Sequence, residues 1–99
     1  MFQVPVDQDR IAEFCLRWNI TEFSLFGSVL RDDFRPDSDV DVLVVFAPDT
    51  QLGWSDWQAM QEGLDEMFGR KVDLVEKRAV TNPFRRHHIL RTHRVVYAR

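Results

Sequence analysis

The sequence predicts a small α/β domain in which helices flank a short β-sheet. Three stretches carry apolar residues at helical spacing, and three shorter stretches between them are rich in β-favouring residues. Helical and strand-like stretches that alternate in this way are typical of a sheet covered by helices. The chain has 99 residues, and we expect residues 1–99 to form a single domain.

The composition is that of an ordinary soluble globular domain, with 44% hydrophobic and 29% charged residues. A net charge of −3 argues against a general nucleic-acid binder, so no direct binding to nucleic acid is expected. The single cysteine excludes an internal disulfide and fits a cytoplasmic protein. No apolar run approaches the ~18 residues needed to cross a bilayer, and no membrane association is expected.

The first predicted helix spans residues 7–18. Acidic residues stand in its first turn, where the helix dipole favours them. Apolar residues then recur at three- and four-residue intervals, and we expect these to face the core: Ile11, Phe14, Cys15 and Trp18. Because Cys15 lies on this apolar stripe, we interpret it as a core residue and not as a reactive thiol.

Two strands are predicted next, over residues 21–26 and 39–46. The first strand ends at Gly27, and a short helix is expected to start over residues 28–31. The second strand is expected near the middle of the sheet. Its segment Val42–Phe46 is continuously apolar, as in strands that are covered on both faces.

A second amphipathic helix is predicted over residues 54–68, and Gly69 is expected to end it. Its apolar stripe consists of Trp54, Trp57, Met60, Leu64, Met67 and Phe68. The two tryptophans could form a base-stacking platform or anchor a partner. A stripe of this kind is more often part of a core, and that is the interpretation we adopt.

The last third of the chain predicts a strand and a helix. The strand covers residues 70–75, and the helix opens at Asn82-Pro83, with asparagine as its cap and proline in its first turn. The inward face of this helix is expected to come from Phe84, His87 or His88, and Ile89-Leu90. Val95–Tyr97 is interpreted either as a short edge strand or as an extension of the helix.

Two aspartates at alternate positions open the second strand. Residues i and i+2 of a strand project from the same face, so Asp39 and Asp41 point together and repel each other. A divalent cation such as Mg²⁺, which prefers oxygen ligands, removes that repulsion. Gly27-Ser28 can form a tight turn and a helix N-terminus that binds an anion. Together these features predict a site for Mg²⁺-triphosphate. The alternative interpretation of Asp39 and Asp41 is a solvated strand end, and that of Gly27-Ser28 is a plain turn.

The C-terminal segment is basic and free of acidic residues. Its ionisable side chains are Arg85, Arg86, His87, His88, Arg91, His93, Arg94 and Arg99, besides Tyr97. Such a segment can complement a helix C-terminus, contact an acidic partner or line the triphosphate side of a cleft. A zinc site on the three histidines is disfavoured, because adjacent histidines point in different directions on a helix and no cysteine lies nearby.

Gly27-Ser28, ten intervening residues and Asp39-x-Asp41 together resemble the signature of the nucleotidyltransferase superfamily that includes DNA polymerase β. The context is similar to its short prokaryotic branch, the minimal nucleotidyltransferase (MNT) antitoxins. This resemblance covers nearly the whole chain and implies a small mixed sheet flanked by helices, in the polymerase β-like nucleotidyltransferase fold. Relatives often carry an arginine directly after the serine, where this chain has Val29.

The resemblance also implies a set of site residues. Asp39 and Asp41 are expected to hold two Mg²⁺ ions, with ATP as the substrate. Asp73 stands where the family places its third carboxylate, and it shares their face if its strand pairs beside theirs. The phosphates are expected to contact Gly27, Ser28 and, because Val29 stands where relatives often have an arginine, Arg31. The alternative for Arg31 is an ion pair with Asp32 or Asp33.

The resemblance finally implies a partner and an acceptor. MNT antitoxins act on HEPN-family ribonuclease toxins, so the expected reaction transfers AMP from ATP to a tyrosine hydroxyl of such a toxin. A chain of this length has little sequence left for an acceptor-binding domain, which favours a second protein as acceptor. Two alternatives remain open: a non-catalytic antitoxin that covers the toxin, and a nucleotidyltransferase that acts on small molecules.

Overall fold

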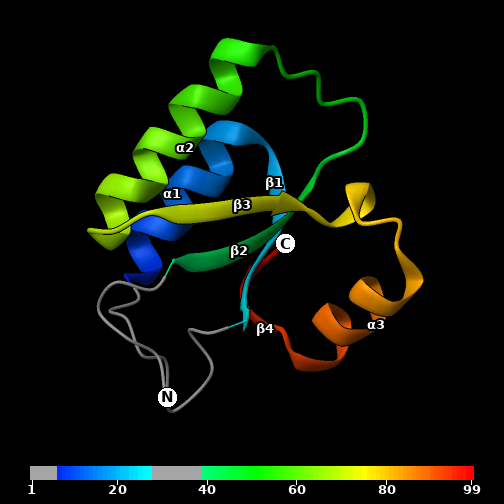
Figure 1. Cartoon of the computed structure of the whole chain (residues 1–99). Coiled ribbons are helices and arrows are strands. Elements are labelled where there is room, and N and C mark those ends of the chain that lie inside the picture. Colours follow the sequence, from blue (N-terminus) through cyan, green and yellow to red (C-terminus); the bar gives the residue numbers. More distant parts are fainter. Residues whose placement is uncertain (1–6, 28–38) are drawn as a thin grey trace.

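The computed structural model describes residues 7–27 and 39–99 (Figure 1). Along the chain the elements are α1 (Gln8–Trp18), β1 (Ile20–Phe26), β2 (Val40–Phe46), α2 (Trp54–Phe68), β3 (Val72–Glu76), the 3-10 turn η2 (Lys77–Ala79), α3 (Pro83–Thr92) and β4 (Arg94–Ala98). The helix expected over residues 28–31 lies outside the described residues. None of the described helices is long and apolar enough to cross a membrane.

The strands form one mixed sheet with the order β3-β2-β1-β4. β1 is antiparallel to β2 and to β4, whereas β2 and β3 are parallel. The α/β fold with a mixed sheet is therefore confirmed, as is the inner position of the strand that begins after Asp39. Of the two interpretations of Val95–Tyr97, the edge strand is correct, because these residues lie in β4.

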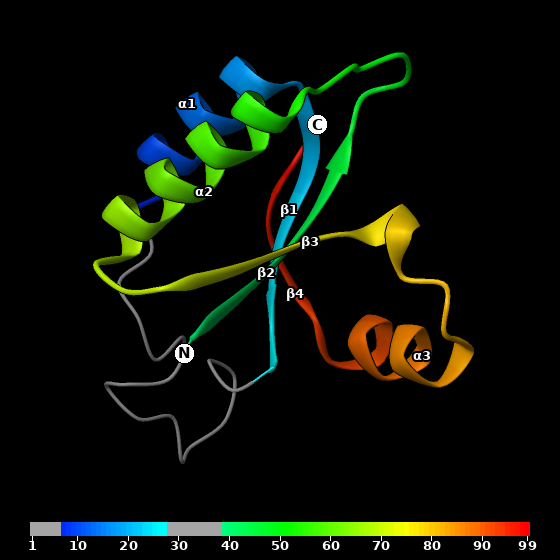
Figure 2. The ribbon, with the colours of Figure 1, turned by 45° about the horizontal axis from the view of Figure 1, so that its top comes forward.

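The main hydrophobic core lies between the sheet and the pair α1 and α2, which run side by side on one face (Figures 1 and 2). Asp7 caps α1 by accepting a hydrogen bond from the Arg10 amide at 3.2 Å. The buried residues of this core are Ile11, Phe14, Cys15, Ile20, Phe23, Leu25, Val40, Val42, Val44, Phe46, Met60, Leu64, Phe68 and Val72. Both predicted amphipathic helices thus face this core, as expected.

A second, smaller core lies on the opposite face of the sheet, which α3 covers (Figure 2). Its buried residues are Phe26, Leu43, Val80 and Ile89. Asn82 caps α3 as predicted, since its Oδ1 accepts hydrogen bonds from the amides of Phe84 and Arg85. The strand β2 is therefore covered on both faces, which explains its continuously apolar sequence.

Phe84, His87 and His88 do not lie on the inward face of α3, so the prediction is wrong for these residues. Phe84 is 86% exposed, and His87 and His88 are exposed as well, whereas Ile89 is buried and Leu90 half-buried. A helix turns by about 100° per residue. Phe84 therefore lies about 140° around the axis from Ile89, and His88 about 100° from it.

The core interpretation of the tryptophans holds for one of them. Trp57 is half-buried and packs edge-to-face on Phe46, with ring centroids 5.9 Å apart. Trp54 is 79% exposed, so its assignment to the core is wrong. Each i+3 step turns about 60° away from the starting face, and two such steps separate Trp54 from the buried Met60.

Cys15 is fully buried in the main core, which confirms the structural interpretation of this thiol. Burial raises the pKa of Cys15 to about 12, and the positive charge of Arg99 opposes the shift. The neutral thiol is consequently the form that the folded protein favours.

This burial predicts a specific pH dependence. The folded pKa of Cys15 lies above its ordinary value of 9.0, so the stabilising contribution is present below about pH 9 and is lost as the pH rises towards 12. Wild type should therefore lose more free energy of unfolding than Cys15→Ala over this interval, as measured by urea unfolding at each pH. Equal losses in the two proteins would contradict the assignment.

Candidate active site

Two of the three predicted carboxylates lie opposite each other on neighbouring strands. In the parallel register of β2 and β3, Asp41 pairs with Asp73, and Val40 pairs with Val72. Both valines are buried in the main core. Because side chains alternate along a strand, both aspartates project from the other face, the one that α3 covers. The condition for Asp73 to share a face with Asp41, that the two strands pair, is met.

Asp39 lies just before β2 and is exposed. The Val40 amide donates to the Lys71 carbonyl at 3.0 Å, which fixes this end of β2 against the segment that leads into β3. Asp39 and Asp73 line one hollow of about 540 Å³. The other residues lining this hollow are Gln61, Asp65, Lys71 and Val72.

Lys71 is a site residue that the sequence analysis did not single out. It lines the same hollow as Asp39 and Asp73, so it brings an exposed cation to the acidic site. Its spacing was an available signal, because a residue two positions before Asp73 projects from the same face when the strand extends that far. A lysine at this position suits an anionic ligand.

The start of β3 is held by side chains of α2. Asp65 Oδ1 accepts hydrogen bonds from the Val72 amide at 2.8 Å and from Gln61 Nε2 at 3.0 Å. Gln61 Nε2 also donates to the Val72 carbonyl. Both backbone groups of the residue before Asp73 are thus bonded to one helix, which restricts where the Asp73 carboxylate can lie.

Gly27 follows β1 directly and faces the Asp41 carboxylate. Its φ is +74°, in the left-handed region that favours glycine. A Cβ at this position would stand 2.1 Å from Asp41 Oδ2. Any side chain at position 27 would overlap the Asp41 carboxylate where it now lies. The carboxylate therefore occupies the space that a side chain at this position would take.

The carboxylates match Mg²⁺ in kind, since this ion binds one or two carboxylates together with substrate phosphates. The register that sets Asp41 opposite Asp73 brings two oxygen ligands of this kind to one face. Within residues 7–27 and 39–99, no group of three His, Cys, Asp or Glu side chains lies close enough to hold a metal. The complete three-acid site therefore stays a prediction. Ser28 and Arg31 lie outside the described residues.

The model of the nucleotidyltransferase domain family matches residues 9–96 of the chain. The chain belongs to this family. Sequence relatives agree with the match. MJ1379 of Methanocaldococcus jannaschii, a candidate protein adenylyltransferase, is 31% identical over 68 residues, which are 69% of this chain and 68% of the relative. The protein adenylyltransferase MntA of Thermococcus cleftensis is 38% identical over 61 residues, 62% of this chain and 60% of the relative.

Solved structures share the fold of this nucleotidyltransferase. A candidate minimal nucleotidyltransferase superposes with a TM-score of 0.71 at 31% identity, covering 88% of this chain and 86% of that one. A toxin–antitoxin with AMP-PNP gives 0.74 at 18% identity, covering 95% and 75%. The complex of a tri-AMPylated HEPN toxin with its MNT antitoxin from Shewanella oneidensis gives 0.65 at 17% identity, covering 93% and 70%.

The contact between Gly27 and Asp41 predicts a coupled effect of substitutions. Gly27→Ala should lower the free energy of unfolding by about 2–3 kcal/mol, since a left-handed alanine costs about 1 kcal/mol and its methyl group meets the carboxylate. With Asp41→Ala in the background, the cost should fall to about 1 kcal/mol. Urea unfolding of the four proteins in this double-mutant cycle measures the coupling.

Gly69 offers a matched control for that cycle. It also has a positive φ, +68°, but nothing lies within 4 Å of a Cβ added there. Gly69→Ala should therefore cost about 1 kcal/mol whether or not Asp41 is present. A Gly27→Ala cost that is independent of Asp41 would show that the two residues do not share this space.

Proposed function

We propose that this nucleotidyltransferase is a Mg²⁺-dependent protein adenylyltransferase that transfers AMP from ATP to a tyrosine hydroxyl of a HEPN-family toxin. It acts as the antitoxin of that toxin. The observation that carries the proposal is the register that sets Asp41 beside Asp73, with the backbone of Gly27 against the Asp41 carboxylate. Relatives named protein adenylyltransferase and the AMP-PNP complex of a structural neighbour support it.

In this proposal the acidic residues hold the ion and the glycine turn holds the nucleotide. Asp39, Asp41 and Asp73 are the ligands of two Mg²⁺ ions. Gly27, Ser28 and Arg31 bind the phosphate oxygens of ATP, and the exposed Lys71 beside Asp73 adds a further positive charge. Bound magnesium supplies charge neutralisation of the triphosphate and lowers the pKa of the attacking hydroxyl.

The reaction is an in-line displacement at the α-phosphorus of ATP. The tyrosine oxygen forms a bond to this phosphorus, the bond to the bridging oxygen breaks, and pyrophosphate leaves. Asp73, the outermost of the paired carboxylates because β3 is an edge strand, receives the hydroxyl proton. Catalysis then consists of positioning and charge stabilisation, for which the fixed strand register is well suited.

Modification of the toxin explains how such an enzyme acts as an antitoxin. AMP on a tyrosine near a ribonuclease active site adds bulk and a negative charge where an RNA phosphate must bind. The structural neighbour from Shewanella oneidensis pairs an MNT antitoxin with a tri-AMPylated HEPN toxin. By analogy, the acceptor of this chain is a HEPN toxin encoded by the neighbouring reading frame.

The paired carboxylates favour this function over the two alternatives. A protein that silences its toxin by covering it has no use for two acids in register beside a side-chain-free turn. The second alternative, an enzyme that modifies small molecules, further requires an acceptor pocket for that molecule. Labelled ATP, Mg²⁺ and the partner protein distinguish the three, because label appears on the partner, on nothing, or on small molecules only.

The acidic residues provide the direct test. Asp39→Asn combined with Asp41→Asn should reduce AMP transfer to the partner by roughly three orders of magnitude or more, because the charge that holds the ion is lost. Transfer is measured with labelled ATP, and folding by circular dichroism. Asp9→Asn, an exposed acid in the first turn of α1, should leave transfer unchanged. Full transfer by the folded double variant would refute the assignment.

Removal of the metal gives an independent prediction. Excess EDTA should stop transfer by the wild-type protein, and added Mg²⁺ should restore it, because the carboxylates alone cannot neutralise the triphosphate. The measurement is the rate of pyrophosphate release in the presence of the partner. A rate that is insensitive to EDTA would exclude the Mg²⁺-dependent mechanism.

A further inference from the structure

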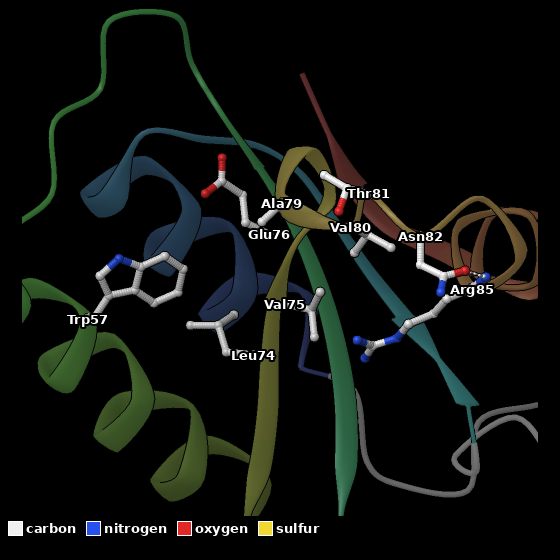
Figure 3. A pocket seen from close by; sticks show the side chains of 9 residues that line it. All are labelled: Trp57, Leu74, Val75, Glu76, Ala79, Val80, Thr81, Asn82 and Arg85. Atoms are coloured by element: carbon white, nitrogen blue, oxygen red, sulfur yellow. Dashed lines mark hydrogen bonds between the residues drawn. The ribbon is translucent and has the colours of Figure 1, made fainter.

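Arg85 lies on the side of α3 that carries Ile89, but its residue is exposed and is not part of the core. It precedes the buried Ile89 by four residues, which places both on one side of the helix. Figure 3 shows its side chain extending from α3 towards the sheet, where its guanidinium lies on the side of Val75. Arg85 and Val75 line one hollow of about 430 Å³, together with Leu74 and Trp57.

One residue of this hollow, Val75, can be placed relative to the carboxylate pair from the strand register. Val75 pairs with Leu43 in the register of β3 and β2, and Asp73 pairs with Asp41 two residues earlier. Residues two apart on a strand share a face and are separated by about 7 Å. Val75, which lines the hollow of Arg85, therefore shares a face with Asp73 and lies about 7 Å from it along the strand.

The adjacent arginine has a different task. Arg86 Nη1 donates to the carbonyl of Lys77 at 2.8 Å and to that of Val80 at 3.5 Å, so it holds the turn before α3. The side chain of Arg85 makes no hydrogen bond or ion pair with any residue in the described part of the chain. Among the residues that line this hollow, Glu76 is the one carboxylate, and it forms no ion pair with Arg85.

We infer that Arg85 binds a phosphate group of the nucleotide above the Asp41–Asp73 pair. This inference rests on the proposed function. The planar guanidinium presents two parallel N–H groups that match phosphate oxygens, and such charge-assisted hydrogen bonds are stronger than neutral ones. A guanidinium that forms no hydrogen bond or ion pair with residues 7–27 and 39–99 suits a ligand that brings its own negative charge. One residue of the basic C-terminal segment thereby acquires a function.

The test is the affinity of the purified chain for Mg²⁺·AMP-PNP, measured by calorimetry without any partner. Arg85→Ala should raise the Kd about tenfold or more, and Arg85→Lys should recover part of the loss. Arg91→Ala is the matched control, since Arg91 is an exposed arginine of the same helix about 160° around the axis from Ile89. It should change the Kd by less than about twofold.

AMP as a second ligand distinguishes the phosphates. A loss for AMP and AMP-PNP alike places Arg85 at the α-phosphate, whereas a loss for AMP-PNP alone places it at the β- or γ-phosphate; both results support the inference. An unchanged Kd in the folded Arg85→Ala variant, or an effect confined to the KM for the partner protein, would overturn it and leave the proposed function intact. Failure of the wild-type chain to bind Mg²⁺·AMP-PNP would overturn both.

Discussion

The parallel pairing of β2 with β3 is the constraint on which the site depends. It buries Val40 against Val72 in the main core and thereby sets Asp41 beside Asp73 on the opposite face. A slip by one residue would send both acids into the core, where an unpaired carboxylate is costly. The hydrophobic contact therefore fixes the register, and the register brings the two like charges together. Asp65 and Gln61 of α2 reinforce it at the first residue of β3.

Local patterns were sufficient to predict much of this arrangement. The alternation of Asp41 with Val40 and Val42 identified which side chains share a face, and the stripe through Ile11 and Cys15 identified the inward side of α1. These features follow from the geometry of a single element. The pairing of β3 with β2 was stated as a condition, because strand order depends on contacts between distant segments.

The remaining features depend on tertiary contacts or on helix phase. The hydrogen bonds from Val72 to Asp65 join residues of different elements, so no periodicity predicts them. Trp54 and Phe84 are apolar and near apolar stripes, yet the rotation of the helix carries them out to solvent. In the sequence Lys71 is only a charge, and it is the sheet that brings it to the hollow of Asp39 and Asp73.

The two hydrophobic cores are unequal, and this has a consequence for dynamics. Among the described residues, fourteen are buried in the main core on the side of α1 and α2, but only four are buried in the second core on the side of α3. Less packing free energy therefore holds α3 against the sheet than holds α1 and α2. Segments with few buried apolar contacts open locally without global unfolding. Backbone amides of α3 should therefore exchange with solvent faster than those of α1. The helix that carries Arg85 is thus held by the weaker half of the domain, whereas the strands that carry Asp41 and Asp73 are anchored in the stronger one.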